Sequence, residues 1–188
     1  MSAGSDTGIS RFQTFRLVAT ESDLAFQPSR TFTFEAGTEG FKVVDGTFAR
    51  TDAGGGANGS AFYMASSSVT DEQCDVVQSP IVRLTSASTL SLYDQFAIEP
   101  MSDAFYDRAN VGIHDVFAGS RTLVAPSGGR TYNANGPNGS CVTTGLPGWA
   151  GAGPLWQEST WSAVALQSAS FAGRLVRLDM GYGTDPLI

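Results

Sequence analysis

The segment DAFYDRANVGIHDV, residues 103–116, brings together residue types that catalysis often uses. Asp103, Asp107 and Arg108 are followed closely by His114, which is the single histidine of the chain. A histidine beside carboxylates suggests a triad, but a triad also needs a nucleophile in contact with that histidine. The alternation of the segment turns His114 onto its less apolar face, and the chain has no G-x-S-x-G elbow. We therefore expect no catalytic residue here, and we expect Arg108 to pair with a neighbouring acid.

Two acidic loop residues are better suited to bind a metal. Glu35 lies in FEAGTEGF, and Asp52 begins the glycine-rich stretch DAGGG. Calcium takes about six to eight oxygen ligands, often from carboxylates and loop carbonyls. We expect a structural calcium ion held by Glu35, Asp52 and backbone carbonyls. The alternative is that both are solvated loop acids.

Aromatic residues late in the chain suggest a second kind of site. Sugar-binding sandwiches stack exposed aromatic rings on pyranose rings and place amides around the edge. Trp149 lies in the glycine-rich LPGWAGAG, where exposure is plausible, and Tyr132 and Asn133 lie in GRTYNANGPNG. We expect these three residues to form a ligand-binding site if their loops meet. The alternative is ordinary loop packing, which is also what we expect of Trp161 in the core.

The two cysteines, Cys74 and Cys141, lie in polar, loop-like surroundings. A single disulfide between them is the simplest expectation for a secreted protein, and two free thiols are the alternative. Two cysteines and one distant histidine give neither the number nor the spacing of ligands that zinc requires.

Composition excludes several partners. The net charge is −7, and the eleven basic residues are scattered singly, so no basic stripe is available for nucleic acid. No stretch approaches the roughly 20 apolar residues that span a bilayer. The opening MSAGSDTGIS has no apolar segment of the kind found in secretory leaders. We expect a secreted, extracellular protein that is not transmembrane, with any export signal either removed or never present.

Apolar residues recur with period 2, which indicates strands with one buried face. The pattern is clearest in RTFTFEAG, STLSLYDQFAIE and RLVRLDMGY, and further strands are predicted, including one at TWSAVALQ. Glycine-, asparagine- and proline-rich turns separate them. The sequence therefore predicts an all-β antiparallel jelly-roll β-sandwich of about ten strands with little or no helix. Asp94 falls on the apolar face of its strand, so it needs an arginine, a metal or backbone donors, unless a bulge turns it outward.

The order of these segments resembles the MAM-like jelly-roll (concanavalin-like) domains of secreted bacterial proteins. The resemblance covers residues 31–185, and its most specific pieces are SPIVRL…LSLYDQFAIE and W…ESTWSAVAL…FAGRLVRLDMGYGTD. Such domains accompany immune-inhibitor-A-type metalloproteases as non-catalytic accessory modules, and some sandwiches of this type hold a structural calcium. The chain has no HExxH helix, so it resembles the accessory module and not the protease.

These observations predict the organisation and function together. Residues 31–188 are expected to form the jelly-roll domain, without the last strand that relatives usually have after GTD, and residues 1–30 an N-terminal arm or extra strand. The predicted function is accessory or adhesive binding of a surface glycan or a partner domain. The alternative is a structural subunit that exchanges strands between neighbouring copies. A hydrolase that uses His114 or a pair of carboxylates is a third interpretation.

Overall fold

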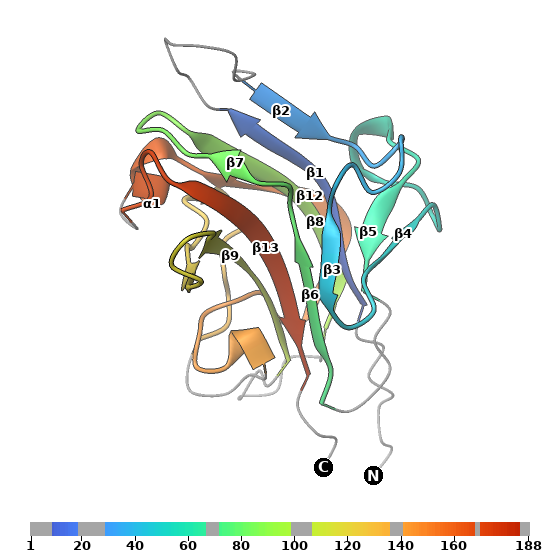
Figure 1. Ribbon diagram of the computed structural model, residues 1–188. Helices are drawn as coiled ribbons and strands as arrows, with labels where there is room; N and C mark the ends of the chain where they lie inside the picture. Colours follow the sequence, from blue (N-terminus) through green and yellow to red (C-terminus); the bar gives the residue numbers. More distant parts are fainter. Residues whose placement is uncertain are drawn as a thin grey trace.

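The computed structural model describes residues 9–18 as a backbone strand, together with residues 29–66, 72–98, 107–135, 141–167 and 170–184. These residues form two antiparallel β-sheets packed face to face (Figure 1). The predicted all-β sandwich is therefore confirmed. The described residues contain thirteen strands where about ten were expected, because several are only two to four residues long.

The seven-stranded sheet, called sheet I, lies behind in Figure 1. Its order is β11 (Gly128–Gly129), β12 (Ala152–Trp161), β8 (Thr89–Ala97), β1 (Ile9–Val18), β5 (Tyr63–Ala65) and β4 (Ala49–Thr51), with β2 (Ser29–Phe32) also pairing with β1. The six-stranded sheet, sheet II, lies in front. Its order is β10 (Arg121–Leu123), β9 (Arg108–Asp115), β13 (Leu175–Gly183), β6 (Cys74–Gln78) and β3 (Lys42–Asp45), with β7 (Val82–Arg83) pairing with β13. The chain passes repeatedly between the two sheets, as in a jelly roll.

The core lies between the sheets and follows the period-2 pattern of the sequence. Residues of β8 alternate between half-buried and buried, with Leu90 and Leu92 inside. They belong to the same apolar cluster as Val176, Leu178 and Met180 of β13 in the opposite sheet. The predicted inward faces of both strands are confirmed.

The N-terminal segment lies inside sheet I. Strand β1 pairs with β8 from Ile9 opposite Ala97 to Val18 opposite Thr89. Its other edge pairs with β2 and β5. Residues 9–18 are therefore an internal strand that joins β8 to the strands on the far side of the sheet.

Two predicted strands end early. The strand expected at residues 160–167 stops at Trp161 and is followed by helix α1 (Ala163–Gln167). Ser162 starts this helix, because its side-chain oxygen accepts from the Ala165 N–H and its carbonyl from the Leu166 N–H. The strand expected around residues 30–37 stops at Phe32, because Phe34 has a positive φ of 63°.

The remaining helical turns are η1 (Ala57–Gly59) and η2 (Cys141–Thr143). Across the described ranges no helix is long and apolar enough to cross a membrane.

Candidate ligand site

A bulge in β12 creates the most distinctive local geometry of sheet I. Gly153 pairs with Phe96 and Gln157 pairs with Asp94, so three residues of β12 face the single residue Gln95. The Gln95 amide donates to the carbonyl of Pro154, inside the bulge. The bulge is therefore tied to β8 by a side-chain hydrogen bond as well as by backbone pairing.

The side chains of the bulge point in different directions. Leu155 is 76% exposed, whereas Trp156 is half-buried and packs edge-on against Tyr63 of β5, with ring centroids 5.3 Å apart. The Trp156 indole N–H donates to the carbonyl of Gly55 at 3.4 Å. Because β8 and β1 separate β12 from β5 in sheet I, this contact spans both strands.

Asp94 is buried on the inner side of β8, with 1% of its surface exposed. Its Oδ1 lies 2.6 Å from Arg130 Nη1, so the arginine partner anticipated from the sequence is present. Arg130 is the residue that directly follows β11, and its Nη2 donates to the Leu155 carbonyl at 2.8 Å. The arginine therefore joins β8, β12 and the end of β11.

Ser159 contacts both the Asp94 carboxyl and the backbone of Arg130. Its hydroxyl oxygen lies 2.8 Å from Asp94 Oδ2 and 2.7 Å from the Arg130 carbonyl oxygen. A hydroxyl has one proton to donate, so the Ser159 O–H is shared between these two acceptors. Burial raises the pKa of Asp94 to about 6, against the opposing effects of Arg130 and Ser159.

A pocket of about 350 Å³ opens beside this ion pair. Its walls include Phe96, Arg130, Asn133, Trp149, Leu155 and Gln157. Gln157 accepts from Arg130 Nε at 2.9 Å, and its amide nitrogen has no partner among the described residues. The pocket thus combines an apolar wall with amide and guanidinium groups that are held in place by other contacts. Its volume is in the range that suits a small ligand.

The three predicted ligand residues do come together, but not as an exposed platform. Trp149 is 0% exposed, so the expectation that it is exposed is wrong. Its ring packs against Tyr132 with centroids 4.8 Å apart, and its indole N–H donates to the Arg130 carbonyl at 3.3 Å. The backbone of Trp149 also pairs with Ala109 in sheet II, which draws the glycine-rich segment inward.

Tyr132 and Asn133 also hold the fold at this point. The Tyr132 hydroxyl accepts from the Val111 N–H at 2.9 Å, and burial raises the pKa of this phenol. The Asn133 side chain bonds to both backbone groups of Ala150, each at 3.0 Å. Both residues support the wall of the pocket, and Asn133 lines it directly.

The residues that offer contact groups to a ligand were not identified from the sequence. Arg130, Leu155 and Gln157 belong to this set. Arg130 does stand out in the sequence, because it is the sole charged residue between Arg121 and Glu158. Leu155 and Gln157 had no such signal, because the bulge that presents them depends on the register between β12 and β8.

Glu35 accepts hydrogen bonds from residues 60–62. Its Oε1 accepts from Ser60 Oγ at 2.5 Å, from the Ala61 N–H at 2.7 Å and from the Phe62 N–H at 3.3 Å. The Ser60 bond, followed by the Ala61 bond, lowers the pKa of this carboxyl. Asp52 begins the loop, and its carbonyl accepts from the Gly55 N–H at 3.2 Å. Within the described ranges no group of three or more His, Cys, Asp or Glu is placed to hold a metal ion, and the calcium site stays a prediction.

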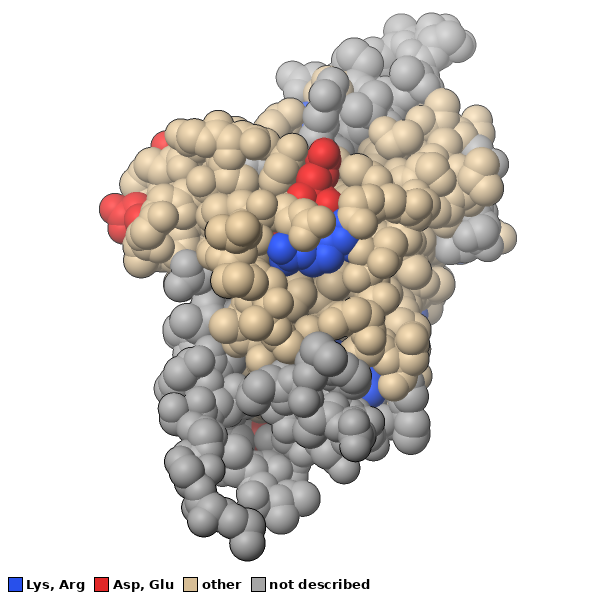
Figure 2. All heavy atoms as spheres, turned by 180° about the vertical axis from the view of Figure 1, so that it is seen from behind, with Lys and Arg blue, Asp and Glu red and all other residues tan. Residues whose placement is uncertain are grey.

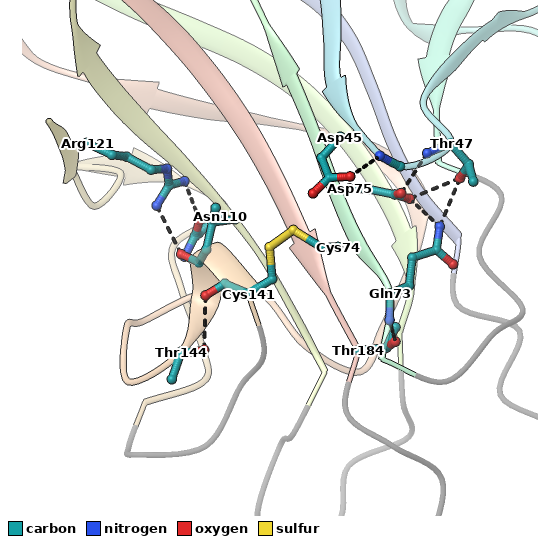
Figure 3. The surroundings of a disulfide bond; sticks show 12 residues. Asp45, Thr47, Gln73, Cys74, Asp75, Asn110, Arg121, Cys141, Thr144 and Thr184 are labelled. Carbon is teal, nitrogen blue, oxygen red and sulfur yellow. Dashed lines mark hydrogen bonds between the residues drawn. A yellow bond between two sulfur atoms is a disulfide. The ribbon is translucent and has the colours of Figure 1, made fainter. Parts of the chain in front are cut away.

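The predicted disulfide between Cys74 and Cys141 is present (Figure 3). It ties β6 to η2, and η2 lies against β13 of sheet II. A Cβ on Gly181 of β13 would lie 2.2 Å from Val142 Cγ2, so glycine is needed for this contact. Arg121 adds bonds to Asp179, to Asn110 and to the Val142 carbonyl, and together these bonds fasten η2 to β9, β10 and β13.

The described part of the segment DAFYDRANVGIHDV, residues 107–116, lies mainly in β9. Arg108 begins β9 and is fully buried, and its guanidinium donates to the carbonyls of Leu146 and Asn135. Its burial lowers the pKa of this guanidinium. His114 is half-buried and lies opposite Arg121 on one side and opposite an arginine of β13 on the other. Asp103 lies outside the described residues.

The fold and the site define an all-β antiparallel sandwich with a disulfide and a pocket beside a buried ion pair. No protein-family model, curated protein or solved structure matches the chain.

Proposed function

We propose that the chain is a non-catalytic, extracellular binding module whose site is the pocket beside Arg130. The observation that carries this proposal is the pocket itself, in which Arg130 and Gln157 are held by other contacts before any ligand arrives. Groups fixed in this way lose little conformational entropy on binding. The disulfide supports an oxidising compartment, because such bonds persist there.

The charge balance of the pocket favours an uncharged, hydroxyl-rich ligand such as a surface glycan. Among the described residues that line the pocket, Arg130 is the sole charged one, and Asp94 lies against it. Figure 2 shows the molecule from the side of sheet I, where charged side chains are sparse among the described residues. An exposed leucine and an amide offer the apolar and hydrogen-bonding contacts that a sugar ring uses.

The test is saturation-transfer NMR on the full chain with a panel of neutral oligosaccharides, and with sialylated and sulfated ones for comparison. We expect neutral members to bind, and Leu155→Asp and Gln157→Ala to weaken binding by about tenfold or more. Val164→Asp is the matched control, because Val164 is 77% exposed on helix α1 and does not line the pocket. A panel with no binder, or binding that both pocket variants leave unchanged, would refute the proposal.

A second candidate, a subunit that exchanges strands between copies, is favoured by the position of β1. This N-terminal strand fills the space between β8 on one side and β2 and β5 on the other. An equivalent strand from a neighbouring copy could make the same backbone pairs. Light scattering on the full chain and on a variant without residues 1–25 tests this candidate. Large assemblies that disappear in the variant would favour it over the binding module.

A further inference from the structure

Strand β3, with the sequence Lys42-Val43-Val44-Asp45, lies at the end of sheet II as described. All four residues are exposed, and Val43 and Val44 are 46% and 58% exposed. A strand of a sandwich normally buries one face against the core, and its free edge carries unpaired backbone groups. Two adjacent exposed valines on such an edge present apolar surface and hydrogen-bonding groups together.

The strand is anchored at both ends although its own four residues are exposed. Before it, Phe41 is 4% exposed and packs edge-on against Phe32 and Phe34, with ring centroids 5.0 and 5.1 Å away. After it, the Thr47 N–H donates to buried Asp75 at 2.7 Å (Figure 3). Both ends of β3 are therefore anchored, and the four exposed residues lie between these anchors.

The turn after β3 allows no larger residue. Gly46 has a φ of +74°, and a Cβ there would lie 1.6 Å from Asp75 Oδ1. The Gly46 N–H donates to Asp45 Oδ1 at 2.9 Å, which leaves the second carboxylate oxygen of Asp45 for another partner. Among the described residues no ion pair involves Lys42 or Asp45.

We propose that β3 is the interface for a second copy of this chain, paired antiparallel about a two-fold axis between Val43 and Val44. The sequence is complementary to itself in this register. Lys42 of each copy faces Asp45 of the other, and Val43 faces Val44. Opposite charges and β-branched residues in directly opposed positions both stabilise antiparallel pairs.

Pairing through β3 ends with a dimer. Each copy uses its β3 edge once, so the two-fold contact closes and joins the two copies of sheet II into one. The register of β3 with β6 shifts between Val43 and Asp45, which marks a bulge. A bulge bends the strand and confines pairing to a short segment, and for this reason we expect a weak, concentration-dependent dimer.

A charge swap tests this register in sedimentation equilibrium on the full chain. Lys42→Glu places acid opposite acid, and Asp45→Lys places lysine opposite lysine, at both ends of the pair. We expect each variant alone to raise the dimer dissociation constant by about tenfold or more. An equimolar mixture of the two variants should dimerise as the wild type does. In the mixed dimer the introduced glutamate of one copy faces the introduced lysine of the other, and the unchanged Asp45 faces the unchanged Lys42.

Asp45→Lys also removes the hydrogen bond from the Gly46 N–H, so this variant alone does not separate lost pairing from a damaged turn. Recovery of the dimer in the mixture shows that the charges across the interface are the cause. Val44→Lys should abolish the dimer, while Val164→Lys, a matched exposed valine elsewhere, should not change it. A wild-type chain that is monomeric at the highest attainable concentration would overturn the proposal, as would a mixture no better than either variant. A dimer exchanged through β1 would survive all three β3 substitutions, which also counts against the proposal.

Discussion

The carboxylate of Asp94 and the guanidinium of Arg130 lie 2.6 Å apart and join residues 36 positions apart in the chain. Their side chains are 1% and 12% exposed, so the pair is largely shielded from solvent. The same arginine holds the β12 bulge through the Leu155 carbonyl. One ion pair therefore fixes both the inner surface of β8 and the wall of the pocket.

The raised pKa of Asp94 predicts a pH dependence with a definite sign. The native carboxyl titrates at about 6 and the unfolded one near its ordinary value of 3.8. Between these values the native state binds the extra proton, so the free energy of unfolding falls as pH rises through the window. About two pKa units correspond to a loss of about 3 kcal/mol. Urea unfolding from pH 4 to 7 should show this loss in the wild type and not in Asp94→Asn.

Removing Arg130 should destabilise the fold strongly. Arg130→Met leaves the Asp94 carboxylate buried without its cation, which typically costs about 3–5 kcal/mol. The double variant Asp94→Leu with Arg130→Met should recover much of this loss, because it removes the charge that lacked a partner. Urea titrations of the wild type, both single variants and the double variant give the coupling energy. A cost below about 1 kcal/mol for Arg130→Met would indicate a solvated surface pair.

The disulfide should contribute substantially to stability. Its cysteines are 67 residues apart, and closing a loop of that size stabilises by about 4 kcal/mol in the chain-entropy model. Replacing both cysteines by serine should lower the free energy of unfolding by that order. The native protein should take up no thiol reagent without a reductant. Two reactive thiols in the native state would contradict the bond.

Gly46 and Gly54 form a matched pair for testing the turn after β3. Both have positive φ, +74° and +87°, so alanine strains both backbones similarly. A Cβ on Gly46 would collide with Asp75, whereas one on Gly54 would meet nothing within 4 Å. Gly46→Ala should therefore destabilise by about 2 kcal/mol more than Gly54→Ala. Similar melting temperatures for the two variants would show that Asp75 does not restrict this turn.

The calcium site expected at Glu35 and Asp52 predicts a higher melting temperature in millimolar calcium than in EDTA. A site of micromolar affinity would stabilise by about 4 kcal/mol, or several degrees. Asp52→Asn should remove the difference without touching the bonds that Glu35 makes to residues 60–62. An unchanged melting temperature in the wild type would contradict the site.

Local patterning in the sequence was enough to define the main strands and their inward faces. Alternation is a local property, because successive side chains of any strand point to opposite sides. Leu90 and Leu92 of β8 and Leu178 of β13 are therefore buried as predicted. The sequence also indicated that Asp94 required a partner, because a buried carboxylate is costly without one.

Which residues meet one another depended on the tertiary structure. Arg130 follows β11, and a single strand, β12, lies between β11 and β8 in sheet I. The Arg130 side chain can therefore reach Asp94 on β8, and this strand order is not encoded in any local pattern. Trp149 is buried because its backbone pairs with Ala109 of the other sheet. The pocket depends on a register shift between β12 and β8. Strand order, register and pairing between sheets arise from contacts between residues distant in sequence. The alternation of apolar and polar residues indicates only which face of a single strand is buried.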